Sequence, residues 1–229
     1  MGKLFDLDSP IMRFLSRMAD MIILNILMMI CCIPIITVGA AFTAMHYVLL
    51  KMVRDEEGYL IRGFFKSFVQ NFKQATLIWL FMLVVLAVFA GDWMIFRASA
   101  DTFPQAFVIG VAAVGFIVLM VAVYVFPLLA RFDNSIKNTV CNAALLAIGN
   151  LPKTLLMIVI YAIPFVAAYF SAYSYMFIFM FGISLPAYGA AWLYSNIFKK
   201  FEPQVEQTSD MDFSVNIGWG EEEENEKAD

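Results

Sequence analysis

Long uncharged stretches separated by short polar segments dominate the chain. Four stretches carry no Asp, Glu, Lys or Arg: residues 21–50, 74–91, 102–130 and 154–198. About 20 apolar residues cross the hydrocarbon core of a bilayer as an α-helix. The second and third stretches therefore predict one span each, with Pro104 in the first helical turn of the third. The last stretch is long enough for two spans and predicts a tight turn near residues 171–174.

The first stretch, residues 21–50, is long for one span and short for two. Basic residues collect on the cytoplasmic side of a membrane. A single crossing would leave four bases outside, whereas a hairpin that turns around residues 34–39 leaves only Arg97 outside. We therefore predict a hairpin, whose first helix starts at a cap formed by residues 8–10 and is broken by Pro34. Five spans, with a kinked first helix, are the alternative.

These patterns predict an all-α polytopic membrane bundle with both chain ends in the cytoplasm. The composition agrees, because 62% of the residues are hydrophobic and only 15% are charged, against roughly a quarter charged in a soluble domain. It excludes a secreted domain, a nucleic-acid binder and an ordinary cytosolic enzyme. Within a membrane domain over residues 1–201, the six predicted spans cover about residues 9–34, 39–56, 74–96, 104–130, 153–171 and 174–198.

The segment between the second and third spans, residues 58–73, is amphipathic. Its apolar residues recur at helical spacing on one continuous face, and Arg62, Lys66 and Lys73 lie on the other. This pattern predicts a helix that lies in the cytoplasmic interface of the membrane. Residues 133–150 show a weaker pattern of the same kind. The segment supplies six candidates for contact with the interface or a cytoplasmic partner: Phe64, Phe65, Phe68, Asn71, Phe72 and Lys73.

Few polar side chains lie inside the predicted spans, and those few are candidates for function. His46 is the only histidine of the chain. A lone histidine at membrane depth more often makes one interhelical hydrogen bond than it serves as a proton site, and we favour that interpretation. Gly39 and Gly189 each begin a Gly-Ala-Ala sequence that allows close helix packing. The candidates for helix packing or a polar path are Asn25, Pro34, Thr37, Gly39, Thr43, His46 and Gly189.

The sequence lacks the motifs of common membrane catalysts. It has no P-loop, and one histidine offers little material for a zinc site or a Ser-His-Asp triad. We therefore expect no catalytic residues, no metal and no cofactor, and we predict that the protein is not an enzyme.

The composition changes sharply at the C-terminal tail, residues 202–229. The tail carries ten acids and one base, whereas residues 1–201 carry fourteen bases and nine acids. This predicts a disordered, acidic cytoplasmic tail. Residues 211–219 alternate between apolar and polar, which is a strand signal. One hypothesis is that Phe213 and Trp219 contact a partner's sheet edge or groove; an unstructured tail with scattered apolar residues is the other.

Three segments of the N-terminal half carry a resemblance to a known family. They read CIPIITVGAAFTA at residues 32–44, KMVRDEEG at residues 51–58 and FFKSFVQNFKQA at residues 64–75. In these segments the chain resembles the YesL-like family of bacterial membrane proteins. The likeness covers roughly residues 10–200, is strongest up to about residue 80, and does not include the acidic tail.

The resemblance implies an auxiliary role beside a carbohydrate ABC importer in the bacterial plasma membrane. We therefore expect a non-catalytic accessory subunit that packs against the permease in the lipid bilayer and contacts the ATPase through the basic interface helix or the tail. A stand-alone small-molecule carrier or channel is an alternative, and so is a membrane scaffold unrelated to transport. Neither the sugar nor the stoichiometry follows from the sequence.

Overall fold

The computed structural model describes residues 10–56, 58–98, 104–171 and 173–202. These residues form eight α-helices and one short 3₁₀ helix, with no β-strand among them, so the predicted all-α class is confirmed. In chain order the elements are α1 (Pro10–Cys31), η2 (Ile35–Thr37), α2 (Val38–Val53), α3 (Leu60–Ala98), α4 (Gln105–Arg131), α5 (Ile136–Gly149), α6 (Leu151–Phe170), α7 (Ser174–Phe181) and α8 (Ser184–Phe198).

Most of these helices are long and apolar enough to cross a membrane. Five helical segments of the described chain pass this test: α1, η2 with α2, α3, α4 and α6. The consecutive helices α7 and α8 pass it together, as one span bent by 53°. The chain is therefore a multi-pass membrane protein with five candidate spans, or six when α7 and α8 count as one.

The first apolar stretch holds two helices, as the hairpin prediction requires. α1 ends at Cys31, and Pro34 adopts an extended backbone conformation (φ −77°, ψ 119°) before the 3₁₀ turn. The Thr37 hydroxyl donates to the backbone oxygens of Cys31 at 2.5 Å and Pro34 at 2.7 Å. These bonds hold the connection because the last carbonyls of a helix lack partners within it. α2 then begins at Val38.

The structure differs from the predicted elements in two places. The amphipathic segment over residues 58–73 is helical, but it continues without a break into the next predicted span, so α3 is one helix of 39 residues. The last predicted span, residues 174–198, is instead two helices that meet at residues 182–183. At the first site the charge of Lys73 does not interrupt the helix. At the second, Gly182 stands at the break and Pro186 lies in the first turn of α8, where a proline is tolerated.

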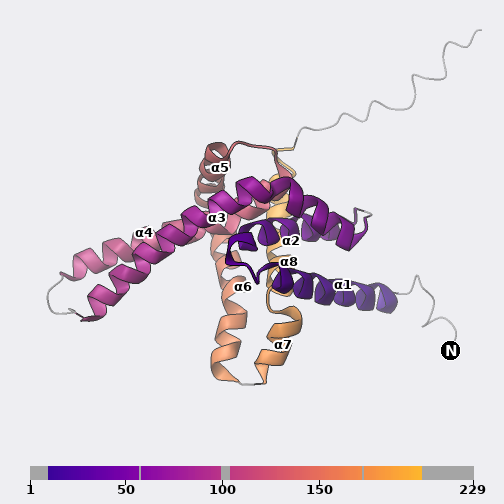
Figure 1. Cartoon of the computed structure of the whole chain (residues 1–229), viewed down its shortest axis with the longest axis horizontal. Helices are drawn as coiled ribbons and strands as arrows, with labels where there is room; N and C mark the ends of the chain where they lie inside the picture. The colour runs from indigo at the N-terminus through magenta and orange to yellow at the C-terminus, as the bar shows by residue number, and fades with distance from the viewer. Residues whose placement is uncertain (1–9, 57, 99–103, 172, 203–229) are drawn as a thin grey trace, which may run out of the picture.

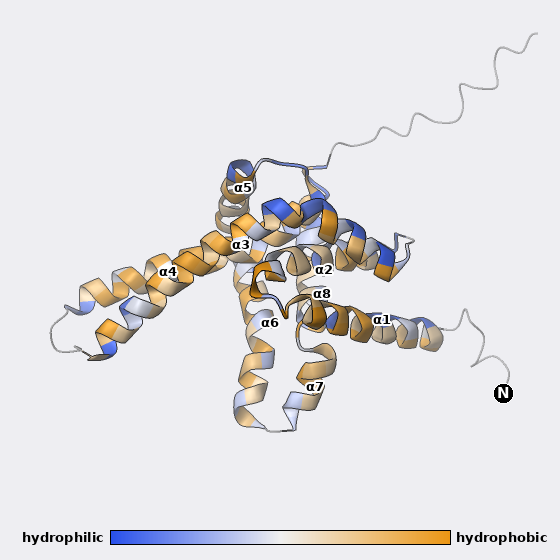
Figure 2. Ribbon diagram, viewed as in Figure 1, coloured by the Kyte–Doolittle hydropathy of each residue, from blue (hydrophilic) through white to orange (hydrophobic). Residues whose placement is uncertain are grey.

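α2 lies at the centre of the molecule and packs against α1, α3, α4 and α8 (Figure 1). The α3–α4 hairpin and the α6–α7 hairpin extend from this centre as separate arms. In the most apolar stretch of α2, 56% of the residues are buried, against 6% in α3 and 6% in α4. Figure 2 shows that the outer lengths of α3 and α4 are nevertheless strongly apolar. Their side chains therefore face the environment of the protein, as lipid-facing side chains do.

Candidate interaction surfaces

Asn25 of α1 lies against the break between α7 and α8. Its side chain is fully buried, and its amide nitrogen donates to the backbone oxygen of Phe179 at 2.7 Å. Its amide oxygen accepts from the backbone nitrogens of Ile183 and Ser184, each at 3.1 Å. One side chain thus satisfies the free carbonyl of one helix end and the free amides of the next. Asn25 therefore holds the broken span together.

The residues after Pro34 bring α2 into close contact with α3 at Gly39. A Cβ atom on Gly39 would lie 2.4 Å from the Ala75 backbone oxygen and 2.6 Å from the Trp79 Cβ, so α2 and α3 meet here with no room for a side chain. The Thr43 hydroxyl is buried and donates to the Gly39 oxygen at 2.9 Å. Gly189 is less constrained, because an added Cβ would make ordinary contact with Ile160 at 3.6 Å.

His46 makes the interhelical hydrogen bond that its position predicted. The ring is buried, and Nδ1 lies 3.1 Å from the Tyr194 hydroxyl of α8. His46 also lines a pocket of about 330 Å³, whose walls are mostly apolar side chains of α3, α4 and α6. Tyr161, which lines the same pocket, has a buried hydroxyl without a hydrogen-bond partner in the described structure.

The predicted polar candidates therefore serve mainly in packing and in hydrogen bonds between helices. Asn25 ties α1 to α7 and α8, His46 ties α2 to α8, and Thr37 closes the first connection. Within the described residues, no group of three or more His, Cys, Asp or Glu side chains is placed to hold a metal ion.

The apolar face predicted on residues 58–73 divides into a buried part and a free part. Phe64 is fully buried, and Phe68 and Phe72 pack partly against the core, so Phe64 has no surface left for a partner. Asn71 donates within its own helix to the Ser67 oxygen at 3.1 Å. Phe65 is 45% exposed and Lys73 is exposed, so these two candidates remain accessible.

Phe65 belongs to a free apolar stripe along the first turns of α3. The stripe comprises Ile61, Phe65 and Val69, which are 53%, 45% and 72% exposed. The other proposed partner contacts, Phe213 and Trp219, lie in the tail outside the described residues.

An ion cluster that the sequence did not predict joins the helix ends. Glu202, the first residue assigned to the tail, accepts from Arg54 Nη1 at 2.9 Å and from Arg131 Nε at 2.8 Å. Arg54 also donates from Nε to the Ser195 hydroxyl at 3.2 Å, and its side chain is 7% exposed. The hydrogen bonds from Arg54, together with the charge of Arg131, lower the pKa of Glu202 from 4.5 to about 2. The carboxylate thus clamps α2, α4 and the end of α8 together.

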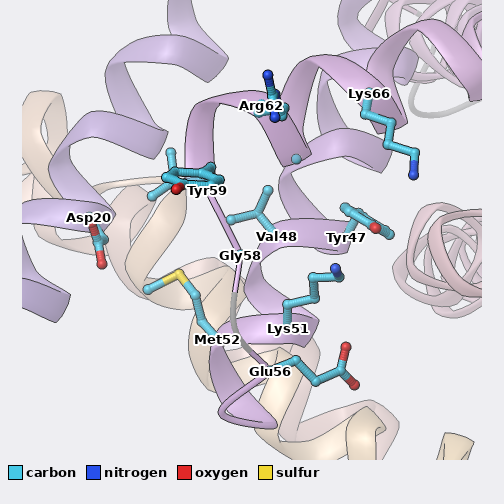
Figure 3. A pocket seen from close by; sticks show the side chains of 12 residues that line it. Asp20, Tyr47, Val48, Lys51, Met52, Glu56, Gly58, Tyr59, Arg62 and Lys66 are labelled. Carbon is cyan, nitrogen blue, oxygen red and sulfur yellow. The ribbon is translucent and has the colours of Figure 1, made fainter.

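A charged pocket of about 210 Å³ opens where α2 turns into α3. Its basic side chains are Lys51 from α2 and Arg62 and Lys66 from α3. Figure 3 shows the Tyr47 ring between Lys51 and Lys66, and Asp20 of α1 on the far side of the pocket from both lysines. The Lys51 ammonium group lies 5.2 Å from the centre of the Tyr47 ring, which stabilises the cation. The i, i+4 spacing of Arg62 and Lys66 was visible in the sequence, but that they line one pocket with Lys51 was not.

A family model matches about one third of the chain. Residues 21–93 match the family described as "Protein of unknown function, DUF624". The matched region holds the second half of α1, all of α2 and most of α3, including Asn25, Gly39, His46 and the lining of the charged pocket apart from Asp20. YesL-like proteins belong to DUF624, so the resemblance in the sequence is supported at the level of this family. No curated protein and no solved structure matches the chain.

Proposed function

We propose that the protein is a non-catalytic accessory subunit of a bacterial carbohydrate ABC importer, and that it packs against the permease inside the plasma membrane. The observation that carries the proposal is the uncovered apolar arm formed by α3 and α4. The identity of the partner rests on the resemblance to YesL-like proteins, and the position of the contact rests on the arm.

The arm offers a regular surface to a second membrane protein. Further along α3, within the arm, a second stripe of exposed apolar side chains recurs at intervals of four, three and four residues, which keeps these side chains on one helix face. The stripe comprises Leu77, Phe81, Val84 and Val88, which are 56%, 67%, 62% and 58% exposed. Between helices in lipid, such side chains gain van der Waals contact and shape complementarity when they pack against a partner.

The use of the buried polar groups agrees with a packing role. The side chains of Asn25, Thr43 and His46 are hydrogen-bonded within the protein, where they fix helix ends and helix pairs. A carrier needs polar groups that exchange partners with a solute along a path. The groups described here instead stabilise one arrangement of α1, α2, α7 and α8.

We further propose that both chain ends face the cytoplasm. Three ion pairs join helix ends. Arg17 of α1 pairs with Asp55 after the end of α2. Arg54 at the end of α2 and Arg131 at the end of α4 both pair with Glu202, which follows α8. In a six-span topology these ends share one side of the membrane. That side carries most of the bases, and so the positive-inside tendency makes it cytoplasmic. A tag at the N-terminus should resist a membrane-impermeant reagent in intact cells; labelling from outside would reverse this orientation.

Affinity purification from native membranes tests the proposed subunit. The full chain should retain a carbohydrate permease and its solute-binding subunit. Replacing the α3 stripe of Leu77, Phe81, Val84 and Val88 by alanine should abolish this retention, because contact area is lost while the helix stays apolar. A matched control replaces Leu156, Val159, Ile163 and Val166, which are exposed on α6, and should leave retention unchanged.

Two outcomes would overturn the proposal. If neither subunit is retained and the purified protein alone moves a solute across liposomes, a stand-alone carrier is the better assignment. If the retained partners belong to no transport system, the protein is a membrane scaffold of another kind.

A further inference from the structure

We propose that the charged pocket between α2 and α3 binds the phosphate group of an anionic ligand, and that the ligand is an anionic lipid headgroup. The pocket is lined by Lys51, Arg62 and Lys66, with Tyr47 and Tyr59 as further hydrogen-bond donors. Ammonium and guanidinium groups are the side chains that proteins use most for phosphate, and the planar guanidinium can hold two phosphate oxygens.

The three cations are available to a ligand. None of them forms an ion pair with an acid of the described residues. Of the two acids that line the pocket, Glu56 lies on the same side as Lys51 (Figure 3) and is 3.9 Å from Arg54. Asp20 lies across the pocket from Lys51 and Lys66 (Figure 3). With three cations against two acids, the pocket lining keeps a net positive charge, which favours an anion.

The backbone fixes the turn that brings these cations together. At the end of α2 the Glu56 nitrogen donates to the Lys51 oxygen at 3.0 Å, and the Asp55 nitrogen donates to the Met52 oxygen at 3.4 Å. Asp55 has a positive φ of 54°, which completes a Schellman-type helix end. The Arg17–Asp55 ion pair joins this turn to α1. Lys51 and the first turn of α3, with its free backbone amides, are therefore held in one place before a ligand arrives.

The surroundings of the pocket favour a lipid over a soluble phosphate. The free apolar stripe of Ile61, Phe65 and Val69 lies on α3 next to Arg62 and Lys66. Acyl chains can lie along this stripe while the phosphate is held by the cations, which is the geometry of basic headgroup pockets beside membrane helices. A soluble phosphomonoester would use the same cations without contacting the stripe.

Lipid binding by the purified full chain tests the proposal. Delipidated protein in a neutral detergent is titrated with phosphatidylglycerol or with phosphatidylcholine, and bound lipid is counted by native mass spectrometry. We expect phosphatidylglycerol to bind preferentially. The triple variant Lys51→Gln, Arg62→Gln, Lys66→Gln should bind it about a hundredfold more weakly, since each of the three bases near a membrane surface contributes roughly 1 kcal/mol to anion attraction.

Two control variants separate the pocket from general charge and from misfolding. The matched triple Lys73→Gln, Lys137→Gln, Lys199→Gln removes three charges outside the pocket lining and should leave binding unchanged. Gly63→Leu keeps all charges but places a side chain in the pocket, where an added Cβ makes only ordinary contacts with Tyr47 and Val48 at 3.8 Å and 3.9 Å. It should weaken binding while the protein elutes as a folded species.

Glycerol 3-phosphate, tested by thermal shift, distinguishes the source of the phosphate. If it stabilises the wild type but not the pocket triple, and phosphatidylglycerol shows no preference, the phosphate site stands and its ligand is a soluble phosphomonoester. Equal binding of both lipids together with no effect of glycerol 3-phosphate would overturn the site. Equal binding of phosphatidylglycerol to the wild type and the pocket triple would overturn it as well.

Discussion

α2 and the α3–α4 arm differ in opposite directions in hydropathy and in burial. α2 is less apolar than α4, yet 56% of its most apolar stretch is buried, against 6% in α4. In water the more apolar helix would occupy the core, because burial of apolar surface stabilises the fold. In lipid that gain is absent, and helices associate through close packing and hydrogen bonds. Hydropathy therefore marks which segments enter the membrane, and small and polar residues mark which helix is central.

The residues on the two sides of this comparison follow the same rule. The inner face of α2 carries Gly39, Ala40, Ala44 and Thr43, all buried. The outer face of α4 carries large apolar residues such as Ile109 and Phe116, which are 67% and 44% exposed. The centre is thus closely packed and has no room for larger side chains, whereas the exposed side chains of the arm can contact a partner.

The largest change in stability is expected when the same side chain is added to both regions. Gly39→Leu should destabilise the protein by more than about 3 kcal/mol, or prevent folding, because its Cβ would overlap the Ala75 oxygen and Trp79. Gly110→Leu on α4 should be neutral, since no atom lies within 4 Å of an added Cβ. Thermal unfolding of both variants in detergent measures this, and equal losses of stability would refute the contrast between centre and arm.

A buried polar side chain that has hydrogen-bond partners should contribute more to the free energy of unfolding than one that has none. Asn25→Leu removes the acceptor for the Ile183 and Ser184 amides and should cost about 1–3 kcal/mol of unfolding free energy. Thr76 on α3 has a buried hydroxyl without a hydrogen-bond partner in the described structure, so Thr76→Val should be neutral or slightly stabilising. Denaturant titration in mixed micelles compares the two. A larger loss for Thr76→Val would contradict the prediction that the hydrogen-bonded side chain contributes more to stability than the one without a partner.

The ends of α2 and α4 should respond to acid through Glu202. Its pKa is lowered to about 2 in the folded protein, so the unfolded chain takes up the proton first as the pH falls below 4.5. Above pH 4.5 the contribution of Glu202 to the free energy of unfolding should not change with pH. Between pH 4.5 and pH 2 this free energy should fall by about 1–3 kcal/mol.

Glu202→Gln provides the control for this prediction. The variant should be less stable than the wild type at neutral pH, because Arg54 is nearly buried and loses its charged partner. It should also lose the acid-dependent part of the wild-type curve. Parallel curves for both proteins between pH 4.5 and pH 2 would show that another carboxyl group is responsible.

The smallest expected effect concerns the turn that leads from α2 to the arm. Asp55→Asn keeps a residue that tolerates positive φ but removes the ion pair with Arg17. Because the Asp55 side chain is 75% exposed, we expect a loss below about 1 kcal/mol. Asp55→Leu, which fits this backbone poorly, should cost more. Thermal unfolding at low and high salt measures both, and only the effect of the Asn variant should vanish at high salt.

Much of the fold followed from the sequence through simple physical rules. Charge-free stretches located the spans, and the clustering of bases favoured two helices in the first stretch, where the break at Pro34 is observed. Helical periodicity identified residues 58–73 as a helix, but it could not show that this helix continues into the next span. The break at Gly182 was also missed, because its partner is Asn25, 157 residues earlier in the chain.

The candidate surfaces divide in the same way. The sequence identified Asn25, Gly39 and His46 as unusual residues, since a polar or very small side chain stands out in an apolar stretch. It placed Phe64 and Phe65 on one apolar face that contacts the membrane interface or a partner, because periodicity gives the direction of a side chain relative to its own helix but not what lies beyond it. The structure buries Phe64 and leaves Phe65 accessible.

By itself, the sequence determined that this protein is embedded in a membrane. It also determined which segments of the chain are helical and which few residues depart from the apolar background. Those properties depend on local composition, which lipid and water sort segment by segment. Only the tertiary structure decided that α2 is central, that Glu202 binds Arg54 and Arg131, and that Lys51 meets Arg62 and Lys66 at one pocket. These depend on contacts between residues far apart in the chain, and in a membrane such contacts are chosen by close fit and hydrogen bonding rather than by hydrophobicity.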